Sequence, residues 1–207
     1  MLTVYHLTNS RSDRIVWLVE ELGVDYQLEH FERDPETGRA PAALQALHPF
    51  ARSPLVRDGD LLLSESGAII ETLATKYGAG TIAVAPEEAD YPRYLQWLHF
   101  AEGSSMFQLV LGMFLAGDLG GEPHALAPMA QAGLQAQFRY INDELSSREF
   151  LAADRFTAAD LIMAYGLILA HNQGRLEDCG HIEDYVTRLT AREAYQRAAE
   201  RIATPDA

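Results

Sequence analysis

The feature that most limits the fold is a single change of pattern near Gly78. Up to that glycine, short strand-like runs alternate with runs of helical spacing, and beyond Tyr91 only helical spacing recurs. The segment between them holds glycine, proline and acidic residues, which is typical of a linker. The sequence therefore predicts an α/β domain over residues 1–78, a linker over 79–90 and an all-helical domain over 91–207.

The first part reads as strand, helix, strand, helix, two strands and a helix. Strands are expected at 2–7, 26–31, 55–57 and 61–64, and helices from Ser12 to Gly23, from Pro41 and over 66–77. A strand–helix–strand start favours a parallel pair. Asp58-Gly59-Asp60 is a hairpin-turn signal, so the last two strands should add an antiparallel edge. In the second part, helices are expected from about residue 95, over 122–145, from Thr157, and twice between 181 and 202.

Charge and cysteine content exclude several classes of function. Acidic residues outnumber basic ones by 30 to 16, and the net charge of −14 would repel nucleic acids and anionic membranes. A lone cysteine, Cys179, allows no intramolecular disulfide, and the histidines lack metal-site spacing. The start of the chain does not resemble a signal peptide, and the longest apolar run is too short for a membrane helix. We therefore expect a cytoplasmic protein without a metal, a nucleic-acid partner or a membrane partner.

Four motifs carry the functional argument. They are TNSRSDRIVW (8–17), HPFARSPLV (48–56), SESGAII (64–70) and FTAADLIMAYGL (156–167). In this order they resemble the soluble glutathione transferases, in a bacterial type with a serine/asparagine-like active-site loop. The resemblance covers nearly the whole chain. It implies a thioredoxin-like α/β domain followed by an all-α domain, with glutathione as co-substrate.

The second motif contains Ser53-Pro54, which the resemblance implies to be a cis-proline turn before the third strand. The residue before such a proline offers its N–H and C=O to a ligand, which can pair there as an added strand would. The resemblance therefore assigns Ser53 and Pro54 to the cysteinyl unit of glutathione. The alternative is that Pro54 simply begins an edge strand.

Glu65 and Ser66 open a helix in the third motif. The resemblance assigns them to the γ-glutamyl group, with Ser66 and the helix amides binding its carboxylate and Glu65 its α-ammonium. The alternative is an ordinary helix cap with an acid near the helix dipole. Arg52, Arg11 and Arg39 are candidate partners for the glycyl carboxylate, or else solvated surface bases.

Activation of the glutathione thiol needs a hydrogen-bond donor that favours thiolate over thiol. Arg14 and Ile15 match the basic–apolar pair that often begins the first helix in the family. This match puts Asn9 where other members carry serine or cysteine. We expect Asn9 first and Ser10 second to meet the sulfur, with Tyr5 as a further candidate. Tyr5 is otherwise expected to pack within its strand, and Ser12 to cap the helix.

The fourth motif holds Thr157 and Asp160 at capping-box spacing, a structural feature of the family. The electrophile pocket is expected between the domains, facing the sulfur. Its candidate walls are Leu7, His99, Glu102, Gly103, Met106 and Tyr165. His99 can instead be a packed residue.

The resemblance implies a homodimeric transferase that joins the glutathione thiolate to a small apolar electrophile, with a part in detoxification. Because the active-site loop has no cysteine, a mixed disulfide with glutathione is not expected. One alternative, motivated by the non-ionising Asn9, is a non-catalytic protein that binds apolar ligands or a partner. Another is glutathione-dependent reduction of peroxides or disulfides without a protein thiol. The maleylacetoacetate isomerase branch is disfavoured because its serine-serine-cysteine loop is missing.

Overall fold

The computed structural model describes residues 1–50 and 52–204. The chain divides into two compact units. The first combines Met1–Ala83 with the chain from Thr190 onward, and the second is Val84–Leu189. Each unit is described by itself below.

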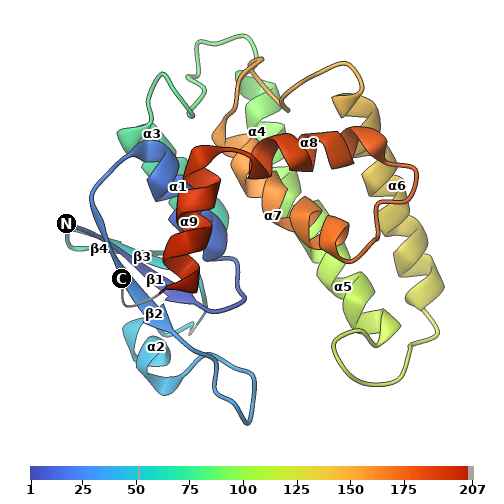
Figure 1. Ribbon diagram of the computed structural model, residues 1–207, viewed down its shortest axis with the longest axis horizontal. Coiled ribbons are helices and arrows are strands. Elements are labelled where there is room, and N and C mark those ends of the chain that lie inside the picture. Colours follow the sequence, from blue (N-terminus) through green and yellow to red (C-terminus); the bar gives the residue numbers. More distant parts are fainter. Residues whose placement is uncertain (51, 205–207) are drawn as a thin grey trace. The chain divides into compact units, whose positions relative to one another are not determined.

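A mixed four-stranded sheet forms the centre of the first unit. Its strands are β1 (Leu2–Leu7), β2 (Tyr26–Phe31), β3 (Leu55–Asp58) and β4 (Leu61–Ser64), in the order β2-β1-β3-β4. β1 is parallel to β2, and the two pairs that involve β3 are antiparallel (Figure 1). The expected parallel pair and antiparallel edge are both confirmed.

Three helices accompany the sheet: α1 (Asp13–Leu22), α2 (Ala42–Leu47) and α3 (Ser66–Tyr77). The α1 helix ends at Gly23, whose φ of 62° is the left-handed conformation that glycine adopts without a Cβ penalty. One face of β1 packs Tyr5 and Leu7 against Leu44 of α2. Because side chains alternate along a strand, His6 points to the opposite face, toward the start of α1.

The last helix, α9 (Glu193–Ala203), lies beside α1 within the first unit (Figure 1). Tyr195 of α9 packs edge-on against Trp17 of α1 with ring centroids 5.1 Å apart. The sequence analysis assigned this helix to the helical domain. Its amphipathic pattern predicts that a helix forms there but does not identify the surface that covers its apolar face.

Every element described in the second unit is helical. The helices are α4 (Tyr91–Phe100), α5 (Phe107–Ala116), α6 (Ala127–Leu145), α7 (Ala158–Asn172) and α8 (Gly180–Thr190), with a π-helical segment, η1 (Ala101–Met106), between α4 and α5. The predicted capping box at the start of α7 is confirmed. The hydroxyl of Thr157 accepts a backbone N–H of α7, and the carboxylate of Asp160 accepts the N–H of Thr157. The expected thioredoxin-like domain followed by helices is thus confirmed as the fold.

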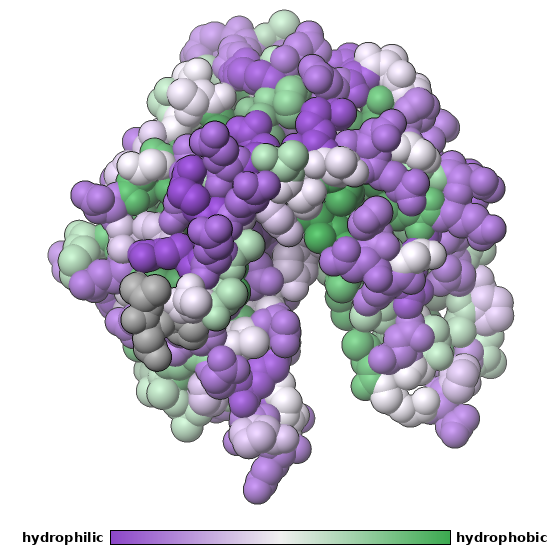
Figure 2. All heavy atoms as spheres, viewed as in Figure 1, coloured by the Kyte–Doolittle hydropathy of each residue, from purple (hydrophilic) through white to green (hydrophobic). Residues whose placement is uncertain are grey.

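Hydrophilic side chains cover most of the face seen in Figure 2, in keeping with the net charge of −14. Among the residues that the structure describes, no helix combines the length and the apolar character needed to cross a membrane.

Candidate functional site

The Ser53–Pro54 peptide bond is cis, as the resemblance implies. Pro54 is buried and immediately precedes β3, whereas Ser53 is half-buried. The hydroxyl of Ser53 lies 3.0 Å from that of Ser10, in the turn that precedes α1. Two segments that the sequence analysis singled out separately therefore meet through their side chains.

Ser10 belongs to a buried row of polar groups. Its Oγ lies 2.8 Å from Oγ of Ser12, which in turn lies 2.9 Å from Nδ1 of His6. We call Ser53, Ser10, Ser12 and His6 the serine–histidine chain. It runs from the cis-proline loop to the buried face of β1.

The prediction that Ser12 caps α1 with its side chain is wrong. Ser12 occupies the N-cap position, but its hydroxyl makes no cap bond. Instead it accepts the backbone N–H of Leu7 at 3.1 Å and lies 3.3 Å from the carbonyl of the same residue. The Ser12 hydroxyl also contacts His6, which faces the start of α1 from the sheet. Helix-capping preferences depend on neighbouring residues in the sequence and cannot predict this contact.

Asn9 adopts a φ of +54°, a region that asparagine tolerates better than most residues. Arg33, in the loop after β2, fixes the backbone on both sides. Its Nε donates to the carbonyl of Thr8 at 3.0 Å and its Nη2 to the carbonyl of Asn9 at 2.8 Å. The side chain of Asn9 is exposed and forms no hydrogen bond with the other described residues. Its amide is thus available to a ligand on a backbone held in place.

Glu65 and Ser66 differ from an ordinary cap in two ways. Glu65, rather than Ser66, takes the N-cap position of α3, with a φ of +73° and an exposed side chain. Ser66 is the first helical residue and is 2% exposed, and its Oγ has no hydrogen-bond partner among the described residues. A buried hydroxyl without a partner is unusual in a folded protein and points to a ligand. Strained backbone at both Asn9 and Glu65 agrees with a functional role.

Tyr5, Arg39 and Arg52 form no hydrogen bond or ion pair with the serine–histidine chain among the described residues. Arg11 is half-buried and lies between two members of that chain in the sequence. Tyr5 packs in the core, and its hydroxyl accepts Nε of Arg57 at 3.1 Å, which supports the packing interpretation. Arg39 and Arg52 are exposed, and neither forms an ion pair within the described residues. The guanidinium of Arg52 lies 5.4 Å from the ring centre of Phe50.

Comparison with known proteins identifies the family. The sequence profile "Glutathione S-transferase, N-terminal domain" matches residues 1–75. The solved glutathione S-transferase of Actinobacillus pleuropneumoniae is 30% identical, with a TM-score of 0.88, and the match covers 98% of this chain and 93% of that one. This chain belongs to the glutathione S-transferase family.

Two curated members of the glutathione S-transferase family extend the comparison. Glutathione S-transferase 3 of Schizosaccharomyces pombe is 42% identical over 106 residues, which is 51% of this chain and 43% of that protein. The chain thus matches less than half of that relative. Glutathione S-transferase 1 of Saccharomyces cerevisiae is 25% identical over 97% of this chain and 95% of its own.

The predicted electrophile residues fall in both units. Leu7 is buried against Tyr5 and Leu55, which is a core position. His99 is exposed near the end of α4, and Tyr165 is half-buried on α7. Glu102, Gly103 and Met106 lie in η1, and π-helical segments are frequent at functional sites.

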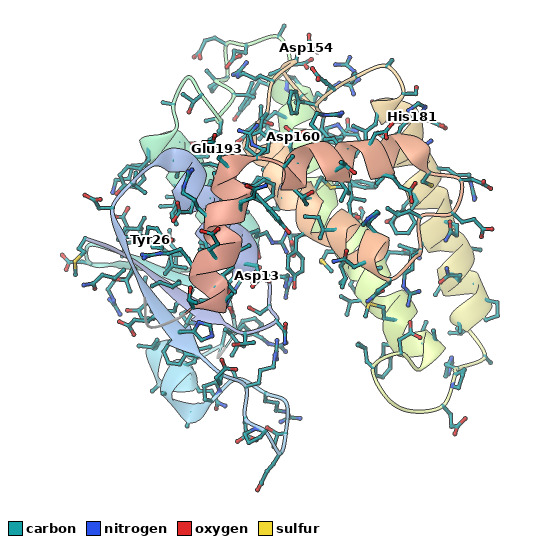
Figure 3. The ribbon with its side chains drawn as sticks, viewed as in Figure 1. Asp13, Tyr26, Asp154, Asp160, His181 and Glu193 are labelled. Atoms are coloured by element: carbon teal, nitrogen blue, oxygen red, sulfur yellow. The ribbon has the colours of Figure 1, made fainter. Side chains whose placement is uncertain are left out.

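Burial shifts the pKa values of His6, a member of the serine–histidine chain, and of Asp13 beside it. Desolvation, followed by the neighbouring His30, lowers the pKa of His6 to about 4. Desolvation raises the pKa of Asp13 to about 6. Asp13 begins α1 (Figure 3), and its Oδ1 lies 3.7 Å from Nδ1 of His6. At neutral pH His6 is therefore uncharged.

Sequence reasoning missed His6 and Arg33. A histidine inside a strand pattern reads as a packed residue, and an arginine in a polar loop reads as a surface base. Nothing in the local sequence shows that Arg33 reaches back to the turn before α1. Within residues 1–50 and 52–204, no three histidine, cysteine or acidic side chains gather in a way that could hold a metal ion.

Proposed function

We propose that this chain is a glutathione transferase that joins the thiolate of glutathione to an electrophilic carbon of a small apolar substrate. The observation that carries the proposal is the 3.0 Å contact between the hydroxyls of Ser10 and Ser53. It joins the turn where the family activates a thiol to the loop where the family binds the cysteinyl unit. Membership of the glutathione S-transferase family supports the same reading.

The proposed binding mode follows the polar groups of the first unit. The backbone of Ser53, next to Pro54, pairs with the cysteinyl unit as an added strand would. The γ-glutamyl carboxylate accepts hydrogen bonds from the Ser66 hydroxyl and from the amides at the start of α3. The ammonium of the same γ-glutamyl group pairs with Glu65. The buried, unpartnered Oγ of Ser66 supports this assignment.

The remaining carboxylate of glutathione requires a base, because the protein as a whole is acidic. Arg52 and Arg39 are supported as candidates by their exposure and by the absence of ion pairs to other described residues. Arg11 is the third candidate. Comparing Arg52→Gln with Arg39→Gln separates the first two by their effect on glutathione affinity.

In the chemical step, the thiol loses its proton to solvent, and a hydrogen bond from Asn9 or Ser10 stabilises the thiolate. The positive end of the α1 dipole favours the same charge. The sulfur lone pair then forms the new S–C bond, and the leaving group departs with the electron pair of the bond that breaks. No residue of the chain forms a covalent intermediate, because the bound co-substrate is itself the nucleophile.

The finer expectations also stay proposals: a homodimer, a cytoplasmic location, a role in detoxification, and an electrophile pocket that includes Glu102, Met106 and Tyr165. The π-helical segment η1 supports the pocket assignment for two of these three residues. Glutathione turnover with an electrophile separates the transferase from a non-catalytic binding protein.

Ser66→Ala tests the binding mode. Loss of a hydroxyl that binds a carboxylate should weaken glutathione binding roughly tenfold, or about 1.4 kcal/mol, measured by calorimetric titration. Ser147→Ala is the matched control, because Ser147 is exposed in the second unit. Equal affinity in the two variants would remove Ser66 from the site.

A further inference from the structure

The serine–histidine chain has a direction, because each hydroxyl donates one proton and accepts at most two. Ser12 is the decisive member. Its Oγ already accepts the backbone N–H of Leu7, and it lies within hydrogen-bonding distance of both His6 and Ser10. One of these two neighbours must therefore donate to Ser12, while Ser12 donates to the other or to the more distant Leu7 carbonyl.

His6 decides which neighbour donates. A neutral imidazole carries its proton on either Nδ1 or Nε2. Nδ1 faces Ser12, whereas Nε2 is buried and has no hydrogen-bond partner among the described residues. A buried N–H without an acceptor is rarer in proteins than an unused lone pair. The proton is therefore better placed on Nδ1, where it has Ser12 as acceptor.

A proton on Nδ1 determines the direction of the other hydrogen bonds in the serine–histidine chain. Both lone pairs of Ser12 are then occupied, so its own proton goes to Ser10, at 2.8 Å rather than to the Leu7 carbonyl at 3.3 Å. Ser10 also accepts the backbone N–H of Ser12 at 3.2 Å. With both of its lone pairs filled, Ser10 must donate outward, to Ser53 or to a ligand.

With the proton on Nε2, the side-chain bonds of the serine–histidine chain reverse, whereas the two backbone N–H groups still donate to Ser12 and Ser10. Ser12 donates to Nδ1, Ser10 donates inward to Ser12, and Ser53 donates inward to Ser10. The serine oxygens would then present lone pairs to the ligand, and these lone pairs repel a thiolate. The two tautomers thus differ in whether the active-site serine can stabilise negative charge.

We propose that His6 is a positioning residue that, as the Nδ1–H tautomer, turns the Ser10 hydroxyl outward to donate to the glutathione sulfur. His6 acts through Ser12 and touches no substrate. The inference rests on the proposed function for the identity of the ligand. The direction of the hydrogen bonds in the serine–histidine chain is a property of the protein alone.

Burial and the neighbouring His30 favour a neutral His6 ring, whereas the nearby carboxylates Asp13 and Glu32 act in the opposite direction. The ring of His30 packs edge-on with centroids 4.7 Å apart, and Nε2 of His30 is bonded to the hydroxyl of Thr8 at 2.9 Å. Asp13 faces Nδ1 at 3.7 Å, beyond hydrogen-bonding distance, and its electrostatic field favours a proton on that nitrogen. Glu32 lies beyond His30, with which it forms a 3.1 Å contact.

The tautomer can be measured without glutathione. Long-range proton–nitrogen NMR spectra of the full chain labelled with ¹⁵N-histidine distinguish the two neutral tautomers, and the His6 signals are those that vanish in His6→Asn. At pH 7 the expected pattern is that of Nδ1–H. An Nε2–H pattern would overturn the proposal, whether or not the protein binds glutathione.

The effect on the thiol is the second test. His6→Leu removes the donor, whereas the amide of His6→Asn can donate from the position of Nδ1. We expect His6→Leu to raise the thiol pKa of bound glutathione by about one unit, read from thiolate absorbance against pH. His6→Asn should restore most of this shift.

Affinity for S-methylglutathione, which has no ionisable thiol, should stay within about twofold in both variants. His181→Asn, on the exposed surface of α8, is the control for a generic histidine loss. An unchanged thiol pKa in His6→Leu would refute the positioning role. So would a parallel loss of S-methylglutathione affinity, because that result marks a structural role. If the wild-type protein binds no glutathione, the proposed function fails. The NMR result alone then decides the direction of the hydrogen bonds in the serine–histidine chain.

Discussion

At the scale of single residues, burial controls the charge of two side chains beside the proposed thiol site. His6 is fully buried and stays neutral, and Asp13 is held partly protonated near pH 6. The two groups respond to acid in opposite directions. Protonation of His6 opposes folding, whereas protonation of Asp13 favours it.

The pH dependence of stability should reveal the contribution of His6. Its pKa in the fold, about 4, lies below the ordinary value of 6.5, so its contribution is complete above 6.5 and is lost as the pH falls toward 4. Between pH 7 and pH 5, wild type should lose about 2 kcal/mol relative to His6→Asn. Urea unfolding of both proteins at the two pH values measures this difference, in which the opposing response of Asp13 cancels. A difference that does not change with pH would show that His6 is not neutral and buried.

At the scale of elements, the start of α7 is fixed by a capping box and a buried carboxylate. Asp160 is buried and accepts the N–H of Leu151 and of Thr157, each at 2.8 Å, and the hydroxyl of Tyr185 at 2.7 Å. Asp160 is labelled at this helix start in Figure 3. One carboxylate thus ties the preceding loop, the cap and α8 together.

Substitutions at this cap should rank by the number of donors they leave unsatisfied. Thr157→Ala should lower the free energy of unfolding by about 1 kcal/mol, and Asp160→Ala by about 3 kcal/mol, because two backbone N–H groups and the hydroxyls of Thr157 and Tyr185 lose their acceptor. Thr187→Ala on the exposed face of α8 is the control, and its effect should be below about 0.5 kcal/mol. Chemical denaturation checks the order, and an Asp160→Ala effect no larger than that of the control would contradict it.

Local patterns predicted the strands, the turn at Gly59 and the capping box, because each depends on residues adjacent in sequence. The serine–histidine chain could not be predicted in the same way. The direction of the Ser12 side chain depends on His6, which approaches from the sheet. The N-cap position of Glu65 depends on a backbone conformation that its residue type does not indicate. The cis bond and the Ser53 assignment came from the family resemblance, because the motif taken alone favoured an edge strand that begins at Pro54.

At the scale of the whole molecule, the chain returns to its first unit at α9. Arg192 contacts both carboxylate oxygens of Glu21, at 2.6 and 2.9 Å, and Glu21 also accepts the indole N–H of Trp17 at 2.9 Å. Arg197 pairs with Glu20 at 2.9 Å in a more exposed position. Two ion pairs of different burial thus join the last helix to the first.

These two ion pairs should contribute unequally to stability. The carboxylate of Glu21 is 8% exposed, so Arg192→Met leaves a buried charge with one donor and should cost about 1 to 2 kcal/mol. Arg197→Met removes a half-exposed guanidinium and should cost less than about 1 kcal/mol. Thermal unfolding at low and high salt compares them, and the Arg197 effect should be the more sensitive to salt. Equal costs would contradict the burial argument.

The proposed function requires that the first unit binds glutathione and holds its sulfur as a thiolate. An ultraviolet difference titration with reduced glutathione at neutral pH tests it directly, since thiolate absorbance needs no choice of electrophile. We predict saturable binding with a thiolate signal that falls in Asn9→Ala or Ser10→Ala. Saturable binding without that signal would contradict thiol activation and favour a ligand-binding or disulfide-handling role. No binding at all would refute the glutathione site while leaving the fold unchanged.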